Sequence, residues 1–379
     1  MPAADFTRFV IDARYVRVGR HDGISRYTAG LCHGLANILE SRPDLDVELM
    51  VSDPRQLDKL PDLRWFMGPD PVSAGEVLTG RLLNRRRPDV VFSPMQTMGA
   101  LRRRFGLILT LHDLIYYEHP DPPQNLPAPV RAGWRLFHKS PWPQRVALNR
   151  ADAVVTVSQT SAALIRDWEL TRRPLFVVPN AAERSSIRDA GEATESWDHR
   201  SKTPRKLVYM GSFMPYKDVE TLVRAAAALP DHELHLVSPV SERRRSELTA
   251  LAPDARSVFH DGLDDGAYRR LLEDATALVH ASRAEGYGLP LMEALCAGTP
   301  VVCTDIPIFH EVCAEAAAYV PAGDHQGFAA AIRGLDDGDV ARERITDGLR
   351  IARRTSWEES ARGLLGVVDR VRYDRLARD

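Results

Sequence analysis

The chain has 379 residues, of which 44% are hydrophobic, and its 50 basic and 52 acidic residues give a formal net charge of −2. This length predicts roughly two or three domains with substantial cores, and the balanced charge excludes a general nucleic-acid binder, which would carry a basic excess. Residues 1–9 contain no apolar signal core and no apolar run is long enough to cross a bilayer, so we expect a cytoplasmic protein.

The four cysteines form no Cys-x-x-Cys pair and have no histidine at zinc spacing, so they are expected to be buried thiols: Cys32, Cys296, Cys303 and Cys313.

In the first half of the chain, short apolar runs alternate with helical segments, which predicts a parallel sheet covered by helices. The expected strands are Phe9–Asp12, Val47–Val51, Asp89–Ser93, Leu107–Leu111, Ala153–Val157 and Leu175–Val178. The first strand, loop and helix lack the G-x-G-x-x-G spacing of a dinucleotide site, which argues against a dehydrogenase. Asp44-Leu-Asp46 precedes its strand, whereas ligands of parallel sheets bind beyond the carboxyl ends, so it is not interpreted as a metal site.

A proline-rich loop, Pro120–Pro129, precedes an amphipathic helix. Its apolar face holds Val130, Trp134 and Phe137, and its neighbouring basic face holds Arg131, Arg135 and Lys139. Core packing on one side and solvent on the other is the expected meaning. Contact of the basic face with a membrane surface or an acceptor is the alternative.

The segment from Glu183 to Arg205 is polar and without apolar periodicity, so we expect an interdomain linker. A second alternating set follows, with strands expected at Lys206–Met210, Glu233–Val237, Ser257–His260, Ala277–Ala281 and Pro300–Cys303. A charged helix opens at Thr355-Ser-Trp357. The predicted fold class is therefore α/β, with two doubly wound parallel sheets.

The stretch from Ser282 to Glu293 concentrates groups suited to chemistry. Glu285 follows a buried strand, and Glu293 lies in the opening turns of a helix with Pro290 in its first turn. Gly286 and Gly288 allow the backbone to approach a ligand, and the helix amino terminus offers free N–H groups to an anion such as phosphate. An ordinary turn with solvated glutamates is the alternative.

This stretch, E-G-Y-G-L-P-L-M-E followed by A-L-C-A-G-T-P-V-V, resembles the signature of the family 4 retaining glycosyltransferases. The resemblance implies the GT-B fold, with two Rossmann-like domains facing across a cleft. It implies an acceptor-side domain at 1–182, a linker at 183–205, a nucleotide-sugar domain at 206–354 and a terminal helix at 355–379 that crosses back to the first domain.

The resemblance also implies roles for individual residues. It gives Glu285 the donor sugar, Glu293 the ribose, and Lys217 the donor diphosphate, with Ser212 standing where an arginine is common. The implied donor-binding residues are Gly23, Gly211, Ser212, Lys217, Gly286, Tyr287, Gly288, Leu289 and Glu293. The implied catalytic residues are His112, Lys217 and Glu285, and Asp22, His112 and Asp113 are implied on the acceptor side. His112 as a strand-end hydrogen-bonding residue and Lys217 as a solvated lysine are the alternatives.

The expected reaction is retaining transfer of a hexose, with mannose favoured, from a nucleoside-diphosphate sugar to a glycan or lipid-linked acceptor. GDP-mannose and UDP-hexoses are the expected donors. No metal or other cofactor and no nucleic acid are expected, and peripheral contact with the inner face of a membrane is compatible with the sequence. A nucleotide-sugar epimerase of the same fold and a non-catalytic nucleotide-sugar-binding subunit are the alternative functions.

Overall fold

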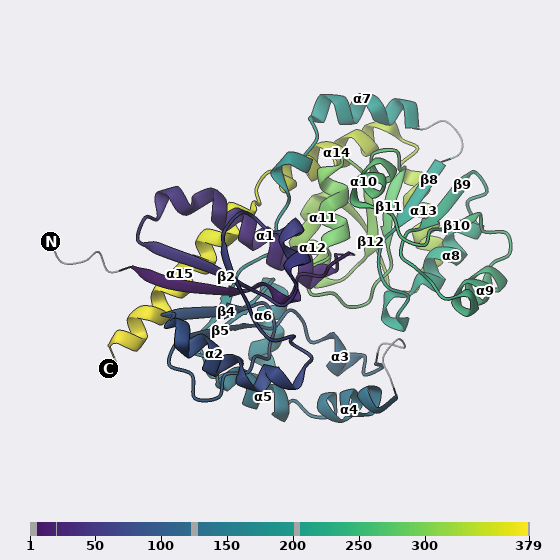
Figure 1. Ribbon diagram of the computed structural model, residues 1–379. Coiled ribbons are helices and arrows are strands. Elements are labelled where there is room, and N and C mark those ends of the chain that lie inside the picture. Colours follow the sequence, from purple (N-terminus) through teal and green to yellow (C-terminus); the bar gives the residue numbers. More distant parts are fainter. Residues whose placement is uncertain (1–5, 20, 123–127, 201–204, 378–379) are drawn as a thin grey trace. The chain divides into compact units, whose positions relative to one another are not determined.

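The computed structural model describes residues 6–19, 21–122, 128–200 and 205–377. The chain divides into two compact units (Figure 1). Unit 1 comprises Met1–Ala181 and Ser356–Asp379, and unit 2 comprises Ala182–Thr355. Each unit contains one parallel sheet with its own hydrophobic core, so the predicted α/β fold class with two doubly wound sheets is confirmed.

Unit 1 is built on a seven-stranded sheet with the order β3-β2-β1-β4-β5-β6-β7. Its strands are β1 (Thr7–Asp12), β2 (Leu45–Val51), β3 (Arg64–Met67), β4 (Val90–Ser93), β5 (Gly106–Thr110), β6 (Ala153–Thr156) and β7 (Leu175–Val177). Its helices are α1 (Gly23–Ile38), α2 (Thr79–Arg86), α3 (Ile115–Glu118), α4 (Ala128–His138), α5 (Trp142–Asn149), α6 (Gln159–Asp167) and α15 (Trp357–Leu376). Every strand pair is parallel, as the alternation of elements predicts.

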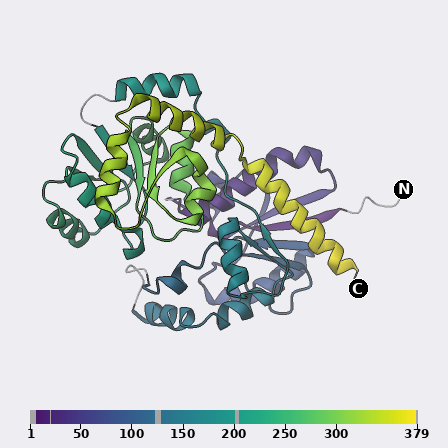
Figure 2. The same cartoon turned by 180° about the vertical axis from the view of Figure 1, so that it is seen from behind.

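The terminal helix α15, yellow in Figures 1 and 2, packs against α1. Ser356 caps it by accepting a hydrogen bond from the backbone N–H of Glu359 at 3.2 Å. Its first residue, Trp357, is 8% exposed and lies over Gly30 and Gly34 of α1, where a Cβ atom would meet Trp357 at 2.2 Å. These two helices can therefore approach closely only because α1 carries glycine at both positions.

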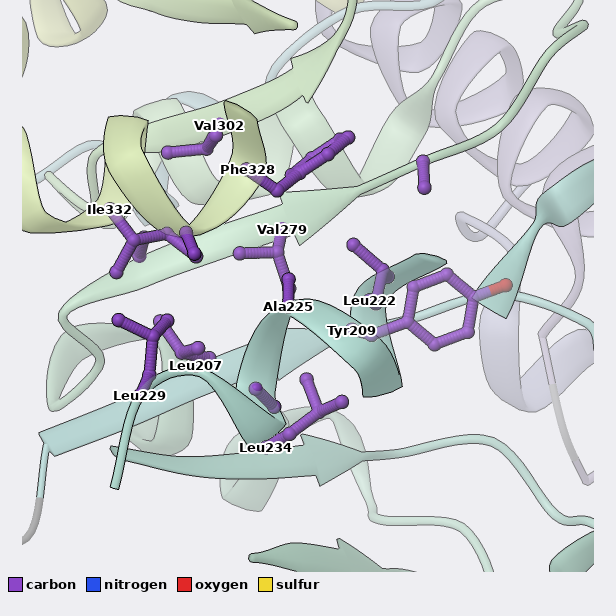
Figure 3. Close-up of a cluster of buried hydrophobic side chains, with 14 of the residues drawn as sticks. Leu207, Tyr209, Leu222, Ala225, Leu229, Leu234, Val279, Val302, Phe328 and Ile332 are labelled. Carbon is purple, nitrogen blue, oxygen red and sulfur yellow. The ribbon is translucent and has the colours of Figure 1, made fainter. Parts of the chain in front are cut away.

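Unit 2 is built on a six-stranded parallel sheet with the order β10-β9-β8-β11-β12-β13. Its strands are β8 (Arg205–Tyr209), β9 (His232–Leu236), β10 (Ser257–Phe259), β11 (Ala277–His280), β12 (Val301–Thr304) and β13 (Ala317–Val320). Its helices are α7 (Ala190–Arg200), α8 (Val219–Ala227), α9 (Glu242–Leu251), α10 (Asp265–Glu273), α11 (Leu289–Cys296), α12 (Pro307–Cys313), α13 (His325–Gly334) and α14 (Gly338–Ala352). Figure 3 shows Leu207 and Val279 of the strands meeting Leu222 of α8 and Ile332 of α13 in its core.

The expected linker 183–205 differs from the structure. It contains α7, and Ala193 and Trp197 of this helix are buried in the core of unit 2. These two residues stand four apart, so they share one helix face, but two apolar positions in a polar segment are too few to show periodicity in the sequence.

The amphipathic helix α4 also differs in part. Trp134 packs edge-on against Tyr116 at 4.7 Å, as a core-facing residue should, but Val130 is 49% exposed. Leu136 on the outer side is 73% exposed. The expected loop Pro120–Pro129 falls partly outside the described residues. The four cysteines are buried free thiols, as expected.

Candidate active site

The strand order of the unit 2 sheet indicates where the candidate site of this unit lies. β8 and β11 are neighbours in the sheet although they are not consecutive in the chain, so the connections after them leave the sheet in opposite directions. Ligands of open parallel sheets bind beyond the carboxyl ends of the strands at such a point. The two loops that leave this point, residues 210–218 after β8 and 281–288 after β11, hold most of the implied donor-binding residues.

Lys217 ends a short 3-10 helix, Pro215–Lys217, in the loop after β8. Its ammonium forms an ion pair with the carboxylate of Glu285 in the loop after β11, and each side chain is 11% exposed. A lysine whose charge is largely withdrawn from water and meets a carboxylate is not a solvated surface lysine. The structure thus brings together two residues that lie 68 positions apart in the sequence.

Glu285 is held in its ionised form by its surroundings. Burial is the largest single influence and acts to raise the pKa of this carboxyl, but the charge and hydrogen bond of Lys217, together with His280 and a hydrogen bond from Ser282, lower the pKa below its usual value. His280, the last residue of β11, places Nε2 3.5 Å from the same carboxylate. Burial lowers the pKa of His280 to about 4, so this histidine is neutral at neutral pH and Lys217 is the cation that stabilises Glu285.

The glycine-rich turn leads directly into α11. Gly288 adopts a left-handed conformation with φ +98°, which L-residues rarely adopt, and it is the residue before the first helical position, Leu289. Tyr287 is only 8% exposed, so its ring anchors the turn. Gly288 has no side chain, so the residue before α11 cannot itself cap the N–H groups of the first turn. Glu293 lies on the same helix, in its second turn.

At the start of the loop after β8, the backbone of Gly211 lies close to the side chain of Tyr209. A Cβ atom at Gly211 would lie 2.7 Å from the hydroxyl oxygen of Tyr209, so a larger residue would displace that ring. The Tyr209 hydroxyl donates to the backbone carbonyl of Ser212 at 2.6 Å, which fixes the start of the loop. The side chain of Ser212 itself is exposed.

Four of the implied residues belong to unit 1. Asp22 caps α1 by accepting from the backbone N–H of Ser25 at 2.9 Å, and Gly23 is the first residue of that helix. His112 follows β5 and its Nε2 lies 2.8 Å from the carbonyl oxygen of Pro94, while Asp113 accepts from the backbone N–H of Ile115 at 3.1 Å. Burial lowers the pKa of His112, so it is neutral at neutral pH. The alternative interpretation of His112, a histidine that forms a hydrogen bond at the end of a strand, predicts a contact such as this one with Pro94.

The corresponding point of the unit 1 sheet, where β1 meets β4, is occupied by a buried ion cluster. Arg14 donates to both carboxylate oxygens of Asp12 at 2.7 and 2.8 Å and to Glu76 at 2.5 Å. The side chains of Arg14 and Asp12 are fully buried. Protein side chains therefore fill this point in unit 1, whereas unit 2 presents glycines and a helix terminus there.

Sequence reasoning missed three residues of the unit 2 site. His280 was assigned only to a strand, although a polar residue at the carboxyl end of an apolar run, next to the signature, was a signal. Asp218 and Arg283 form an ion pair at 2.9 Å between the two loops. Their partnership spans 65 positions and has no sequence signal.

Both carboxylates of the Asp44-Leu-Asp46 sequence are engaged in ion pairs. Asp44 pairs with Arg42 at 2.9 Å, and Asp46 pairs with Arg64. Within the described ranges, no group of three or more His, Cys, Asp or Glu side chains is arranged to hold a metal ion. The part of the chain that the structure describes also contains no helix that is both long and apolar enough to span a bilayer.

Two family models match the chain: "Glycosyltransferase Family 4" over residues 22–185 and "Glycosyl transferases group 1" over residues 192–349. Among solved structures, the chain is similar to sucrose-phosphate synthase from Thermosynechococcus elongatus, with a TM-score of 0.74, 19% identity, and 96% and 99% of the two chains covered. It is also similar to WaaG, a glycosyltransferase involved in lipopolysaccharide biosynthesis, with a TM-score of 0.67, 16% identity, and 95% and 99% covered.

The curated relatives include several mannosyltransferases, of which three are described here. The O-antigen chain mannosyltransferase RfbU of Salmonella typhimurium is 24% identical over 51% of this chain and 53% of its own length. The phosphatidyl-myo-inositol mannosyltransferase of Mycobacterium leprae is 28% identical over 55% and 57%. The MMP α-(1→4)-mannosyltransferase of Mycolicibacterium hassiacum is 25% identical over 84% and 87%. The chain thus spans about half the length of the first two relatives and most of the third.

Two doubly wound parallel sheets, together with the likeness to these solved structures over nearly the whole chain, define the GT-B fold. With both family models matched, the chain belongs to the family 4 glycosyltransferases.

Proposed function

We propose that the chain is a retaining hexosyltransferase that transfers mannose from GDP-mannose to a glycan or lipid-linked acceptor. The observation that carries the proposal is the Lys217–Glu285 pair at the switch point of unit 2, with Glu285 in the loop that leads into the amino terminus of α11. The names of the three mannosyltransferase relatives support mannose, and hence GDP, over the UDP-hexoses.

In the proposed reaction, the bond between the anomeric carbon and the donor diphosphate breaks, and its electron pair goes to the diphosphate. The acceptor hydroxyl oxygen bonds to the same face of that carbon, and its proton goes to a leaving phosphate oxygen. The growing phosphate charge is the one that the protein must stabilise. Lys217 at about 4 Å supplies roughly 4 kcal/mol at an effective dielectric near 20, and the α11 terminus supplies about 0.3 to 2 kcal/mol.

Lys217 is thus the dominant cation in the proposal, and no metal is required. Incubation with GDP-mannose, UDP-glucose and UDP-N-acetylglucosamine, each with glycan and lipid-linked acceptors and with or without EDTA, tests this. We expect sugar transfer from GDP-mannose that survives EDTA. Loss of transfer on chelation, with recovery in magnesium or manganese, would reject the metal-free site, and an isomerised nucleotide sugar formed without acceptor would establish the epimerase instead.

Lys217→Ala should lower the transfer rate by more than roughly a hundredfold, because several kcal/mol of transition-state stabilisation are lost. Lys206→Ala is the matched control, since Lys206 lies in the same unit and pairs with Asp274 at 3.4 Å on the surface. Near-normal turnover of the Lys217 variant would show that the leaving phosphate lies elsewhere.

We further propose that unit 1 contacts an anionic membrane surface through α4 and the start of α5. Leu136 and Trp142 are 73% and 67% exposed there, and Arg135 and Lys139 are exposed beside them. Exposed apolar side chains flanked by cations suit the boundary between lipid headgroups and acyl chains.

A further inference from the structure

The two loops of the unit 2 site are joined by an ion pair next to the Lys217–Glu285 pair. The guanidinium of Arg283 donates to one carboxylate oxygen of Asp218 through Nη2 at 2.9 Å and through Nε at 3.2 Å. The backbone N–H of Arg283 also donates to the carbonyl of Tyr216 at 2.8 Å. One residue of the loop after β11 therefore contacts two residues of the loop after β8.

Asp218 adopts an unfavourable conformation in making this contact. Its backbone is left-handed, with φ +47° and ψ +45°, which L-residues adopt only at an energetic cost that glycine avoids. Asp218 is also the residue that precedes α8, yet its side chain makes no capping hydrogen bond to that helix. The carboxylate instead bonds Arg283, so the contact between the loops is the one favourable role that the described structure gives this side chain.

The position of the pair connects it to the reacting groups. Asp218 directly follows Lys217, and Arg283 precedes Glu285 by two residues. Any shift of Asp218 therefore moves the backbone that carries Lys217. Displacement of a catalytic group by about 1 Å can lower a rate by roughly a hundredfold.

We propose that Arg283 is a positioning residue: by holding Asp218 and the Tyr216 carbonyl, it fixes Lys217 against Glu285 and in place for the donor diphosphate. This inference rests on the proposed function. The Arg283 side chain is 51% exposed and the Asp218 side chain 10%, and such partly solvated ion pairs contribute little to folding stability. Loss of the pair should therefore appear in catalysis and nucleotide affinity rather than in the melting temperature.

The test compares Arg283→Gln, Asp218→Gly and the double variant. Each single variant should lower kcat/KM for the donor about ten- to a hundredfold, and the double variant should fall no further, because both changes remove one interaction. Asp218→Gly is the informative member, since glycine suits the left-handed backbone and should keep or raise the melting temperature. Arg283→Lys, which keeps the charge, should recover part of the loss.

Arg342→Gln is the control, because Arg342 forms a surface pair with Asp339 at 2.9 Å elsewhere in unit 2. Full activity of Asp218→Gly would overturn the proposal. So would a double variant whose loss is the product of the two single losses, since that is the result expected if Arg283 bound the diphosphate directly.

The affinities for GDP and UDP, measured by calorimetry, test this inference independently of the proposed function. Lys217 meets the diphosphate in these nucleotides too, so Arg283→Gln and Asp218→Gly should weaken their binding equally. A wild-type protein without transfer from any nucleotide sugar rejects the proposed function, while the nucleotide affinities still decide the inference. Transfer by the wild type with unchanged variants rejects the inference alone.

Discussion

Glu285 and Glu293 are both carboxylates of one turn-helix segment, but their surroundings differ. Glu285 is paired with Lys217, whereas Glu293 lies on α11, where the family resemblance places the ribose. A ribose contact changes little during reaction, so Glu293→Gln should raise the donor KM about ten- to a hundredfold, as expected for a charge-assisted hydrogen bond of roughly 1.5 to 3 kcal/mol. In the proposed reaction Glu285 faces the charge that develops on the donor sugar, so Glu285→Gln should lower kcat with little loss of donor affinity. Steady-state kinetics would measure kcat and KM, and calorimetry would measure the donor affinity. The reverse pattern in the two variants would contradict these roles.

His280 should make unit 2 sensitive to acid. Burial lowers its pKa from 6.5 to about 4, so the unfolded chain binds the proton more readily in that interval. The free energy of unfolding should therefore fall as the pH drops from about 6.5 to about 4, by on the order of 3 kcal/mol, and stay constant with respect to this group below that.

His280→Leu should remove most of that loss. Urea unfolding at pH 7 and pH 4.5 measures it. His33→Gln, on the exposed side of α1, is the control for the removal of a histidine. Equal acid sensitivity of His280→Leu and the wild type would show that His280 does not carry the effect.

Single residues were predictable where a local pattern marks them. Glu285 was found because it follows a buried strand in a loop with glycines, and Lys217 because the family resemblance implies a lysine in the loop after the first strand of this domain. The structure brings the two side chains together. The pair of Asp218 and Arg283 depends on which strands are neighbours in the sheet, and β8 and β11 become neighbours only through the crossover. No local pattern records that arrangement.

At the scale of elements, the packing of α1 on α15 depends on two glycines. A Cβ atom at Gly34 would lie 2.2 Å from the backbone of Trp357, and a backbone cannot rotate away. Gly34→Ala should therefore destabilise unit 1 by about 1 to 3 kcal/mol. Gly363→Ala is the matched control, because that position on α15 has open space and alanine should stabilise a helix there by about 0.5 to 1 kcal/mol. Thermal unfolding would detect both, and equal effects of the two variants would contradict this packing.

The exposed surface of α4 and α5 gives a second prediction at this scale. Each cation near an anionic membrane is worth about 1 kcal/mol, so the double change Arg135→Gln and Lys139→Gln should weaken binding to phosphatidylserine vesicles by roughly thirtyfold. Arg243→Gln with Arg270→Gln removes two exposed cations of unit 2 and is the control. Binding that is weakened equally by both double variants would leave α4 as a solvated face.

Every strand in the middle of a sheet was predicted, but only two of the four edge strands, β7 and β10, were. All eleven expected strands are present, whereas β3 and β13 were missed, and each lies at the edge of its sheet. β3 (Arg64–Met67) has only Phe66 buried, so it lacks an apolar run. β13 (Ala317–Val320) is short and alanine-rich, and its place is determined by pairing with β12 rather than by its own sequence.

At the scale of the whole molecule, unit 1 is completed by a segment that follows unit 2 in the chain. Deletion of residues 356–379 removes the buried side chains of Trp357, Leu364 and Val368 from unit 1. We expect amide hydrogen exchange to rise throughout unit 1 while unit 2 retains its protection. Deletion of residues 376–379, which begins at the exposed Leu376, should change neither unit. Loss of protection in unit 2 as well would contradict the independence of its core.

The fold class could be predicted from the whole sequence because the alternation of strands and helices repeats in both halves. The segment around α7 could not, because its membership of unit 2 depends on Ala193 and Trp197 meeting a core made by later residues.

The position of unit 2 within the sequence of unit 1 also determines the order in which the two units are synthesised. Residues 182–355 are an insertion within unit 1, and the ends of that insertion are joined by a hydrogen bond from the Ala182 N–H to the Thr355 hydroxyl at 3.3 Å. A nascent chain usually folds its first domain first. Here the ribosome synthesises every residue of unit 2 before those of α15, so we expect the sequence of unit 2 to be complete while the glycine face of α1 still lacks the helix that covers it.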